Sequence, residues 1–163
     1  MNFIFRILKS RHPFEYSQIT DQLYVAAWPT GEDYEVLTEL GVRLVINMDW
    51  VPADEKLSEP PLRVLTISEW DTPVTPMSMN NLWKGVNRAQ EVFDEAGLVM
   101  MYCKGGIHRS VVMACCILIS LGYSAEEAMT LVKARRPVAD PYSKGAKSSI
   151  LKFEEEWNAQ KGD

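Results

Sequence analysis

The amino-acid sequence predicts a single-domain α/β fold in which helices flank a central, mostly parallel, twisted sheet. Two observations support this fold class. Short apolar segments typical of strands alternate with helical patterns through most of the chain, and the C-terminal third carries helical patterns alone. The length of 163 residues suits one sizeable core, and no repeat or linker divides the chain, so we predict one domain over residues 1–163.

The predicted strands are short apolar runs bounded by turn-forming residues. They cover residues 23–27, 42–48, 62–67 and 98–102. Two polar segments that contain proline, 51–61 and 68–76, follow the second and third strands and are predicted to be loops.

The predicted helices show apolar residues at spacings of three and four, and cap residues mark their ends. The first helix is expected to begin near the Thr30–Asp33 pair and to end at Gly41, and the second to begin after Ser78 and to end at Gly97. Gly122 ends the third helix, and the fourth begins at the capping box of residues 124–127 and ends before Pro137. Residues 111–121 are apolar nearly all round, which predicts a buried helix. The last helix carries Ile150, Phe153 and Trp157 on one stripe.

Composition and charge exclude several functional classes. Hydrophobic residues make up 47% and charged residues 24%, as in ordinary globular proteins, and the net charge of −5 argues against nucleic-acid binding. No apolar run approaches the roughly 18 residues of a membrane span. Residues 1–14 lack the features of a signal peptide and are predicted to be a short packed segment, with a weak membrane-surface contact as the alternative. Three cysteines without paired spacing predict reduced thiols and a cytoplasmic location.

The segment CKGGIHRS, residues 103–110, lies between a predicted buried strand and the buried helix. A strand, a glycine-bearing loop and a helix N-terminus together bind phosphate, because backbone N–H groups and the helix dipole favour an anion there. Gly105 and Gly106 let the backbone curl around a tetrahedral oxyanion, and Arg109 offers a planar fork of donors for two of its oxygens. The same donors would stabilise a thiolate at Cys103, and Ser110 could donate a hydrogen bond to that sulfur when it leaves. The segment predicts a nucleophile with an oxyanion site rather than a buried cysteine beside a turn.

CKGGIHRS resembles the active-site signature of the cysteine-dependent protein tyrosine phosphatases: a Cys, five residues, an Arg and a Ser or Thr. Residues 19–48 and 114–141 are similar to the small dual-specificity branch of that family. The resemblance covers most of residues 19–158 and leaves 1–18 as an N-terminal extension. It implies a phosphatase-like α/β fold and the hydrolysis of phosphate monoesters through a phosphocysteine intermediate, with no metal and no cofactor.

The resemblance also implies roles for residues outside the nucleophile. In the family, an aspartic acid on a mobile loop protonates the leaving oxygen and then activates water; Asp71 in SEWDTP is the match, with Glu69 as the rival acid. The implied substrate-binding positions are Lys104, Gly105, Gly106, Ile107, His108 and Arg109. Lys104 and His108 occupy variable positions, where a basic side chain either meets a second phosphate or acidic substrate or is simply solvated.

Three cases depart from the family pattern or stay open. The family usually has histidine directly before the nucleophile, whereas this chain has Tyr102, which we expect to be a buried strand residue with a hydrogen-bonded hydroxyl. Cys115 and Cys116 are expected to pack inside their helix. A protective disulfide between one of them and Cys103 under oxidation requires the two cysteines to lie close together in the fold, and sequence spacing alone does not give that distance.

The predicted activity is a protein phosphatase acting on phosphotyrosine and also on phosphoserine or phosphothreonine. The alternatives are an inositol phosphate phosphatase with the same mechanism, a rhodanese-like sulfurtransferase and a non-catalytic phosphate-binding module. Rhodanese-like enzymes typically have four residues between Cys and Arg, and the presence of Cys103, Arg109 and Asp71 disfavours a non-catalytic module. The expected partners are phosphorylated proteins or small phosphorylated molecules, with no nucleic acid; the sequence leaves the oligomeric state open.

Overall fold

The computed structural model describes residues 14–162, so the prediction for the N-terminal stretch falls almost wholly outside it. Five strands form one sheet in the order β1-β2-β5-β3-β4. They are β1 (Tyr16–Thr20), β2 (Leu23–Ala27), β3 (Val42–Asn47), β4 (Arg63–Thr66) and β5 (Leu98–Cys103). Only the β1–β2 pair is antiparallel. The mostly parallel sheet predicted from the sequence is confirmed.

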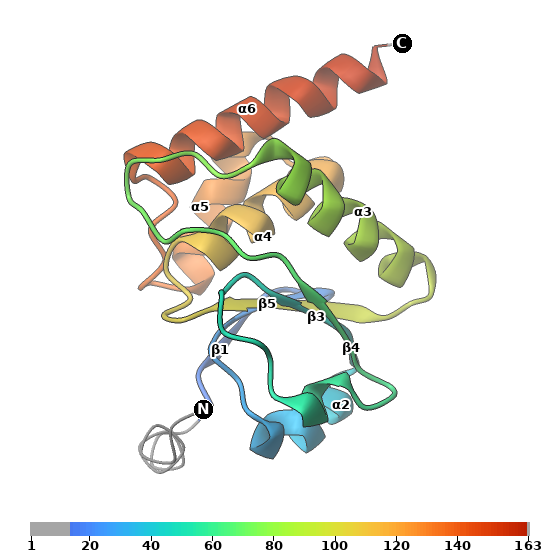
Figure 1. The fold of residues 1–163 in the computed structure, drawn as a ribbon. Coiled ribbons are helices and arrows are strands. Elements are labelled where there is room, and N and C mark those ends of the chain that lie inside the picture. The colour runs from blue at the N-terminus through green and yellow to red at the C-terminus, as the bar shows by residue number, and fades with distance from the viewer. Residues whose placement is uncertain (1–13, 163) are drawn as a thin grey trace.

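Helices cover both faces of the sheet (Figure 1). They are α2 (Tyr34–Leu40), α3 (Met79–Asp94), α4 (Arg109–Ser120), α5 (Ala125–Arg135) and α6 (Lys144–Lys161). Helix α2 lies on one side of the sheet, and α3 to α6 lie on the other. Among the helices of the described residues, none is long and apolar enough to cross a membrane.

Helix α4 is the centre of the larger layer. Every residue from Arg109 to Ile119 is buried, which agrees with the apolar pattern around its whole circumference. The helix contacts the sheet on one side and α3, α5 and α6 on the others. It follows β5, which pairs in parallel with both β2 and β3 in the middle of the sheet. Residues 104–108 therefore lie at the carboxyl edge of the sheet, where ligands bind in open α/β folds.

Strand β1 and the end of helix α3 differ from the sequence prediction. Strand β1 was not predicted, because most of its side chains are only partly buried and form no apolar run; it spans the boundary at residue 18 that the resemblance set. Helix α3 ends at Asp94 rather than next to Gly97, and Ala96 adopts the left-handed conformation with φ 59°. Gly97 instead permits a close approach, since a Cβ there would lie 2.8 Å from the Val92 side chain.

Candidate active site

Cys103 is the last residue of β5, and its side chain meets the first turn of α4. The helix begins at Arg109, two residues earlier than predicted, so Arg109 and Ser110 belong to its N-terminal turn. Cys103 Sγ lies 3.2 Å from Ser110 Oγ, and both residues are buried. A hydroxyl at this distance can donate to a thiolate, and the helix dipole favours negative charge at the same place.

A buried arginine that the sequence analysis missed holds the backbone of the loop. Arg136 follows α5 and is only 1% exposed. Its Nε donates to the carbonyl of Gly106 at 2.7 Å, and its Nη2 donates to the carbonyl of Gly105 at 3.1 Å. In a trans peptide the N–H points opposite to the C=O, so the next two N–H groups, those of Gly106 and Ile107, point away from Arg136. Arg136 thereby keeps the carbonyl oxygens of the loop away from the side on which an anion would bind.

Arg109 is anchored along one edge of its guanidinium group. Nη1 donates to the carbonyls of Met48 at 3.3 Å and Glu69 at 3.1 Å, and Nη2 donates to Asp49 Oδ2 at 3.2 Å. Nε is buried and has no hydrogen-bond partner among the described residues. The Nε and Nη2 donors share the edge that binds two oxygens of a phosphate side by side. The sequence analysis missed Asp49, although its place after β3, next to β5, puts it at the same sheet edge as Cys103.

The two candidate acids of the 68–76 loop have different surroundings. Glu69 is buried, and its Oε1 accepts hydrogen bonds from Asn81 Nδ2 at 2.6 Å and from the Ser78 backbone N–H at 3.2 Å. Asp71 is half exposed, and its Oδ2 lies 3.6 Å from Arg109 Nη2. The structure thus brings Asp71 next to Arg109, while Glu69 supports the start of α3.

The 68–76 loop rests on the first turns of α6. The Gly145 backbone N–H donates to the Pro73 carbonyl at 2.9 Å, and just beyond the loop the Met77 N–H donates to Ser149 Oγ at 2.9 Å. A Cβ at Gly145 would lie 2.7 Å from the Thr75 carbonyl oxygen, so the close contact needs glycine. These contacts hold the loop that carries Asp71 against the helical layer.

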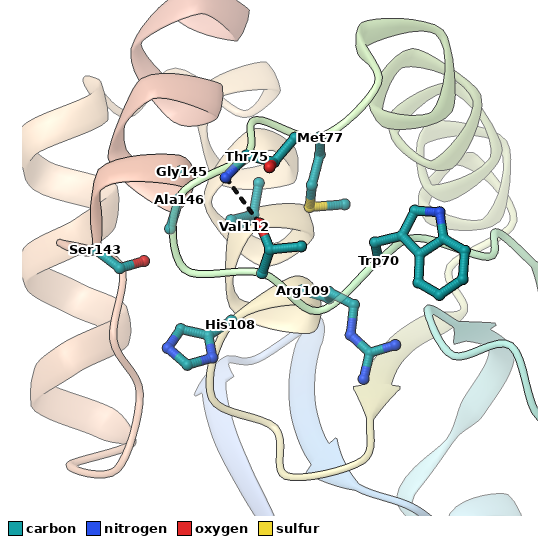
Figure 2. A pocket seen from close by; sticks show the side chains of 10 residues that line it. Trp70, Thr75, Met77, His108, Arg109, Val112, Ser143, Gly145 and Ala146 are labelled. Carbon is teal, nitrogen blue, oxygen red and sulfur yellow. Dashed lines mark hydrogen bonds between the residues drawn. The ribbon is translucent and has the colours of Figure 1, made fainter.

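His108 and Lys104, the two variable basic positions, differ in their contacts. His108 Nδ1 lies 3.4 Å from Asp71 Oδ1, and His108 Nε2 lies 3.6 Å from Asp140 Oδ2. Lys104 is exposed. Figure 2 shows His108 and Arg109 with Trp70 around one pocket, so His108 belongs to the site while Lys104 faces solvent.

Tyr102 is buried, as expected, but its hydroxyl has no hydrogen-bond partner within residues 14–162. The expected hydrogen bond is therefore not found among the described residues, because the ring is packed on the buried side of β5 and its oxygen meets no donor or acceptor there. Burial, with smaller contributions from the carboxylates of Asp49 and Asp54, raises the pKa of the Tyr102 phenol well above its usual range. The hydroxyl stays neutral and does not bond to the loop.

Replacing Tyr102 with phenylalanine is therefore expected to stabilise the protein. Removing a buried hydroxyl without a partner should raise the free energy of unfolding by about 1 kcal/mol, which for a chain of this size corresponds to a Tm increase of roughly 2–4 °C in thermal unfolding. Tyr34→Phe is the matched control, because the Tyr34 hydroxyl donates to the Pro60 carbonyl at 2.6 Å and its loss should lower Tm. A lower Tm for Tyr102→Phe would show that its hydroxyl does have a partner.

Other thiols and potential metal ligands do not gather into a second site in the described residues. Cys103, Cys115 and Cys116 are all free, and the last two lie fully buried inside α4, as predicted. Burial raises the pKa of the Cys115 and Cys116 thiols well above the ordinary value, which keeps them protonated and unreactive. Within residues 14–162, no three His, Cys, Asp or Glu side chains cluster so as to hold a metal ion.

Comparisons with known proteins relate this chain to phosphatases, although no protein-family model matches it. Mouse dual specificity phosphatase 28 is 24% identical over 149 residues, which cover 91% of this chain and 89% of that protein. The human protein of the same name is 26% identical over 148 residues, 88% and 80% of the two chains. A crystal structure of a mouse putative dual specificity phosphatase complexed with zinc tungstate has a TM-score of 0.81 and 23% identity, with 93% of both chains covered. PTPMT1 in complex with PI(5)P has a TM-score of 0.78 and 23% identity, with 90% of this chain and 98% of that chain covered.

A five-residue loop lies between a cysteine and an arginine, at the carboxyl edge of a parallel sheet and at the start of a buried helix, as the resemblance to cysteine-dependent phosphatases predicts. The chain is similar in sequence to dual specificity phosphatases over about nine-tenths of its length, and it has the fold of the solved phosphatase structures. The resemblance and the fold predicted from the sequence are confirmed.

Proposed function

We propose that this chain hydrolyses phosphate monoesters on proteins, phosphotyrosine above all and also phosphoserine or phosphothreonine, through a phosphocysteine intermediate. One observation carries the proposal: Cys103 Sγ lies 3.2 Å from Ser110 Oγ at the base of a loop whose arginine has its Nε buried and unpartnered among the described residues. A nucleophile and a waiting donor for an oxyanion thus share one site. The relatives named as dual specificity phosphatases support the same reaction.

In the first step, the Cys103 thiolate attacks phosphorus and the bond from phosphorus to the leaving oxygen breaks. Asp71 gives its proton to that oxygen, and Arg109 Nε and Nη2 bind two equatorial oxygens as charge spreads over them. In the second step, the Asp71 carboxylate takes a proton from water, the water oxygen attacks phosphorus, and the phosphorus–sulfur bond breaks. Ser110 donates a hydrogen bond to the departing sulfur, which stabilises the returning thiolate.

The charges around the site favour a phosphoprotein over an inositol polyphosphate. His108 lies between the carboxylates of Asp71 and Asp140, and Asp49 lies beside Arg109. A second phosphate next to the first would meet these carboxylates, and like charges brought together raise the free energy of the complex. The structural neighbour solved with PI(5)P keeps an inositol phosphate as the second candidate substrate. The net charge of −5 offers such a substrate no broad basic surface.

The test is a panel of phosphotyrosine, phosphoserine and phosphothreonine peptides with inositol phosphates. We expect the highest kcat/KM for phosphotyrosine peptides, competitive inhibition by vanadate and no effect of EDTA. An inositol polyphosphate with a kcat/KM far above every peptide would overturn the substrate class. If no substrate of the panel were hydrolysed, the proposed phosphatase activity would be overturned, and a module that only binds phosphate would be favoured.

Asp71→Asn should slow hydrolysis most for the substrates whose leaving group is most basic. Positioned general acids contribute typically about 10²–10⁴-fold, and an alkoxide needs a proton more than a phenoxide does. The loss should therefore be largest for phosphoserine, smaller for phosphotyrosine and smallest for an aryl phosphate with an acidic phenol.

Glu69→Gln is the matched control for this prediction. It removes the same charge two residues away, yet an amide oxygen can still accept from Asn81 and from the Ser78 N–H. We expect near-unchanged dependence of the rate on the leaving group. If Glu69→Gln altered that dependence and Asp71→Asn did not, the general acid would be Glu69.

The proposal extends to the setting of the reaction. Three free cysteines are typical of a reducing compartment, which supports a cytoplasmic location. The acidic net charge supports phosphorylated proteins, rather than nucleic acids, as partners. We further propose that residues 1–163 act as one phosphatase domain, whose sheet already includes β1 at Tyr16–Thr20.

A further inference from the structure

Two exposed tryptophans contact each other beside the candidate active site. The rings of Trp50 and Trp70 have centroids 5.0 Å apart at an interplanar angle of 41°. Trp50 is 53% exposed and Trp70 is 71% exposed, the two largest apolar side chains that the described residues leave so open to solvent. They lie on two different segments, one after β3 and one after β4. We refer to Trp50 and Trp70 as the tryptophan pair.

Each member of the tryptophan pair is the chain neighbour of a residue bound to Arg109. Trp50 directly follows Asp49, whose carboxylate accepts from Arg109 Nη2 at 3.2 Å. Trp70 directly follows Glu69, whose carbonyl accepts from Arg109 Nη1 at 3.1 Å, and it precedes Asp71. Figure 2 shows the Trp70 ring next to the Arg109 side chain at the pocket. A phosphate bound to Arg109 would therefore leave the rest of its substrate close to these two rings.

The backbone that presents Trp50 is fixed by hydrogen bonds. Asn47 is fully buried; its Nδ2 donates to the Val51 carbonyl at 2.9 Å, and its Oδ1 accepts from the Asp49 N–H at 2.8 Å. The Ser68 hydroxyl donates to the Asp49 carbonyl at 3.4 Å, which links the two segments. Because these segments are ordered before a ligand arrives, binding there loses less conformational entropy than binding to free loops.

Resting on the phosphatase function proposed above, we propose that the tryptophan pair is the docking surface for an apolar side chain next to the phosphorylated residue of a substrate protein. Phosphorus must reach Cys103 Sγ, so the neighbouring residues of the peptide leave the site past the rings. Two exposed indoles gain most by covering an apolar or aromatic side chain. The carboxylates of Asp49 and Asp71 beside the rings, with the net charge of −5, disfavour an acidic flanking residue or an anionic membrane in that place.

The experiment compares two phosphotyrosine peptides of equal length and charge, with leucine or with glycine on both sides of the phosphotyrosine. In the wild-type protein, the leucine peptide should have a kcat/KM roughly tenfold higher, the size of effect that one apolar contact gives. Trp50→Ala should abolish this preference and leave hydrolysis of a small aryl phosphate within about twofold of wild type. Trp50→Phe should restore most of the preference, because it keeps an aromatic ring.

Tyr123→Ala is the matched control. Tyr123 is 37% exposed and lies just beyond the end of α4 that is far from Arg109. Its loss should therefore leave the kcat/KM for both peptides unchanged. The preference would have another cause if Trp50→Ala kept it or if Tyr123→Ala removed it, and either result would overturn the docking surface.

A binding measurement separates failure of the docking surface from failure of the phosphatase function. The Cys103→Ser variant, which binds without turnover, is titrated with both peptides, alone and combined with Trp50→Ala. Equal affinity for the two peptides would overturn the docking surface even if the wild-type protein is an active phosphatase. A tighter, Trp50-dependent affinity for the leucine peptide would support it even if no turnover is found. Sedimentation with neutral or anionic phospholipid vesicles tests the rival hypothesis, in which the tryptophan pair binds a membrane. Vesicle binding that depends on Trp50, without a preference between the two peptides, would overturn the docking surface and assign the pair to a membrane contact.

Discussion

Replacing Cys103 with serine is expected to abolish phosphatase turnover while leaving phosphopeptide binding intact. A serine hydroxyl is not ionised near neutral pH and is a far weaker nucleophile than a thiolate, so kcat should fall by a factor on the order of 10⁴ or more. Arg109 and the loop N–H groups do not depend on the sulfur, so the affinity for a phosphopeptide should change only severalfold. Rapid acid quenching with radiolabelled substrate should trap phosphate on the wild-type protein and none on the variant.

Cys115→Ala is the control for the loss of a thiol. Cys115 is fully buried in α4, and burial raises the pKa of its thiol, so it takes no part in the chemistry. This variant should unfold at a somewhat lower temperature, because it leaves a small cavity, but it should keep wild-type kcat and the trapped phosphate. A Cys103→Ser variant with near-wild-type hydrolysis would eliminate the phosphocysteine mechanism.

Replacing Arg109 with lysine should lower kcat by about 10³-fold, although the positive charge is retained. Arg109 satisfies two backbone carbonyls through Nη1 and still presents Nε and Nη2 to an anion. A lysine has one ammonium group, which cannot reach those carbonyls and bind two phosphate oxygens at once. The loss should be larger in kcat than in phosphate affinity, because the paired contacts strengthen as charge develops on the equatorial oxygens.

Arg88→Lys is the matched control for that substitution. Arg88 lies on α3 with its side chain 41% exposed, and it pairs with Glu91 at 2.6 Å. An exposed ion pair of this kind contributes little, so both kcat and Tm should stay close to wild type. An Arg109→Lys variant with kcat within about twofold of wild type would contradict the role given to the guanidinium fork.

The two predictions test different parts of one site. Cys103→Ser removes the bond-forming atom, while Arg109→Lys removes the matched donors and keeps the nucleophile. A pseudophosphatase that only binds phosphate would lose little with the first variant and much of its affinity with the second. The two variants thus separate an enzyme from a binding module even before a physiological substrate is known.

The sequence by itself determined the chemistry that we propose for the 103–110 loop, because the pattern that indicates it is local. Cys103 and Arg109 lie in one short segment between a strand and a helix, so their meeting does not depend on which strands neighbour each other. The buried character of α4 and the helix end at Gly41, where φ is 90°, also follow from local patterns of apolar residues and cap residues. The sequence favoured Asp71 over Glu69 only through the family resemblance, because two acids on one loop differ only in what folds against them.

Only the tertiary structure decided which distant residues complete the site. Asp49 and Arg136 reach the loop across 60 and 30 residues of chain, through pairings that strand order and helix packing create. The contact of Trp50 with Trp70, and the unpartnered hydroxyl of Tyr102, arise in the same way. Hydrophobic periodicity shows which face of an element is buried, but it does not show which element covers that face. In this protein, the packing of one element on another determines what surrounds Cys103.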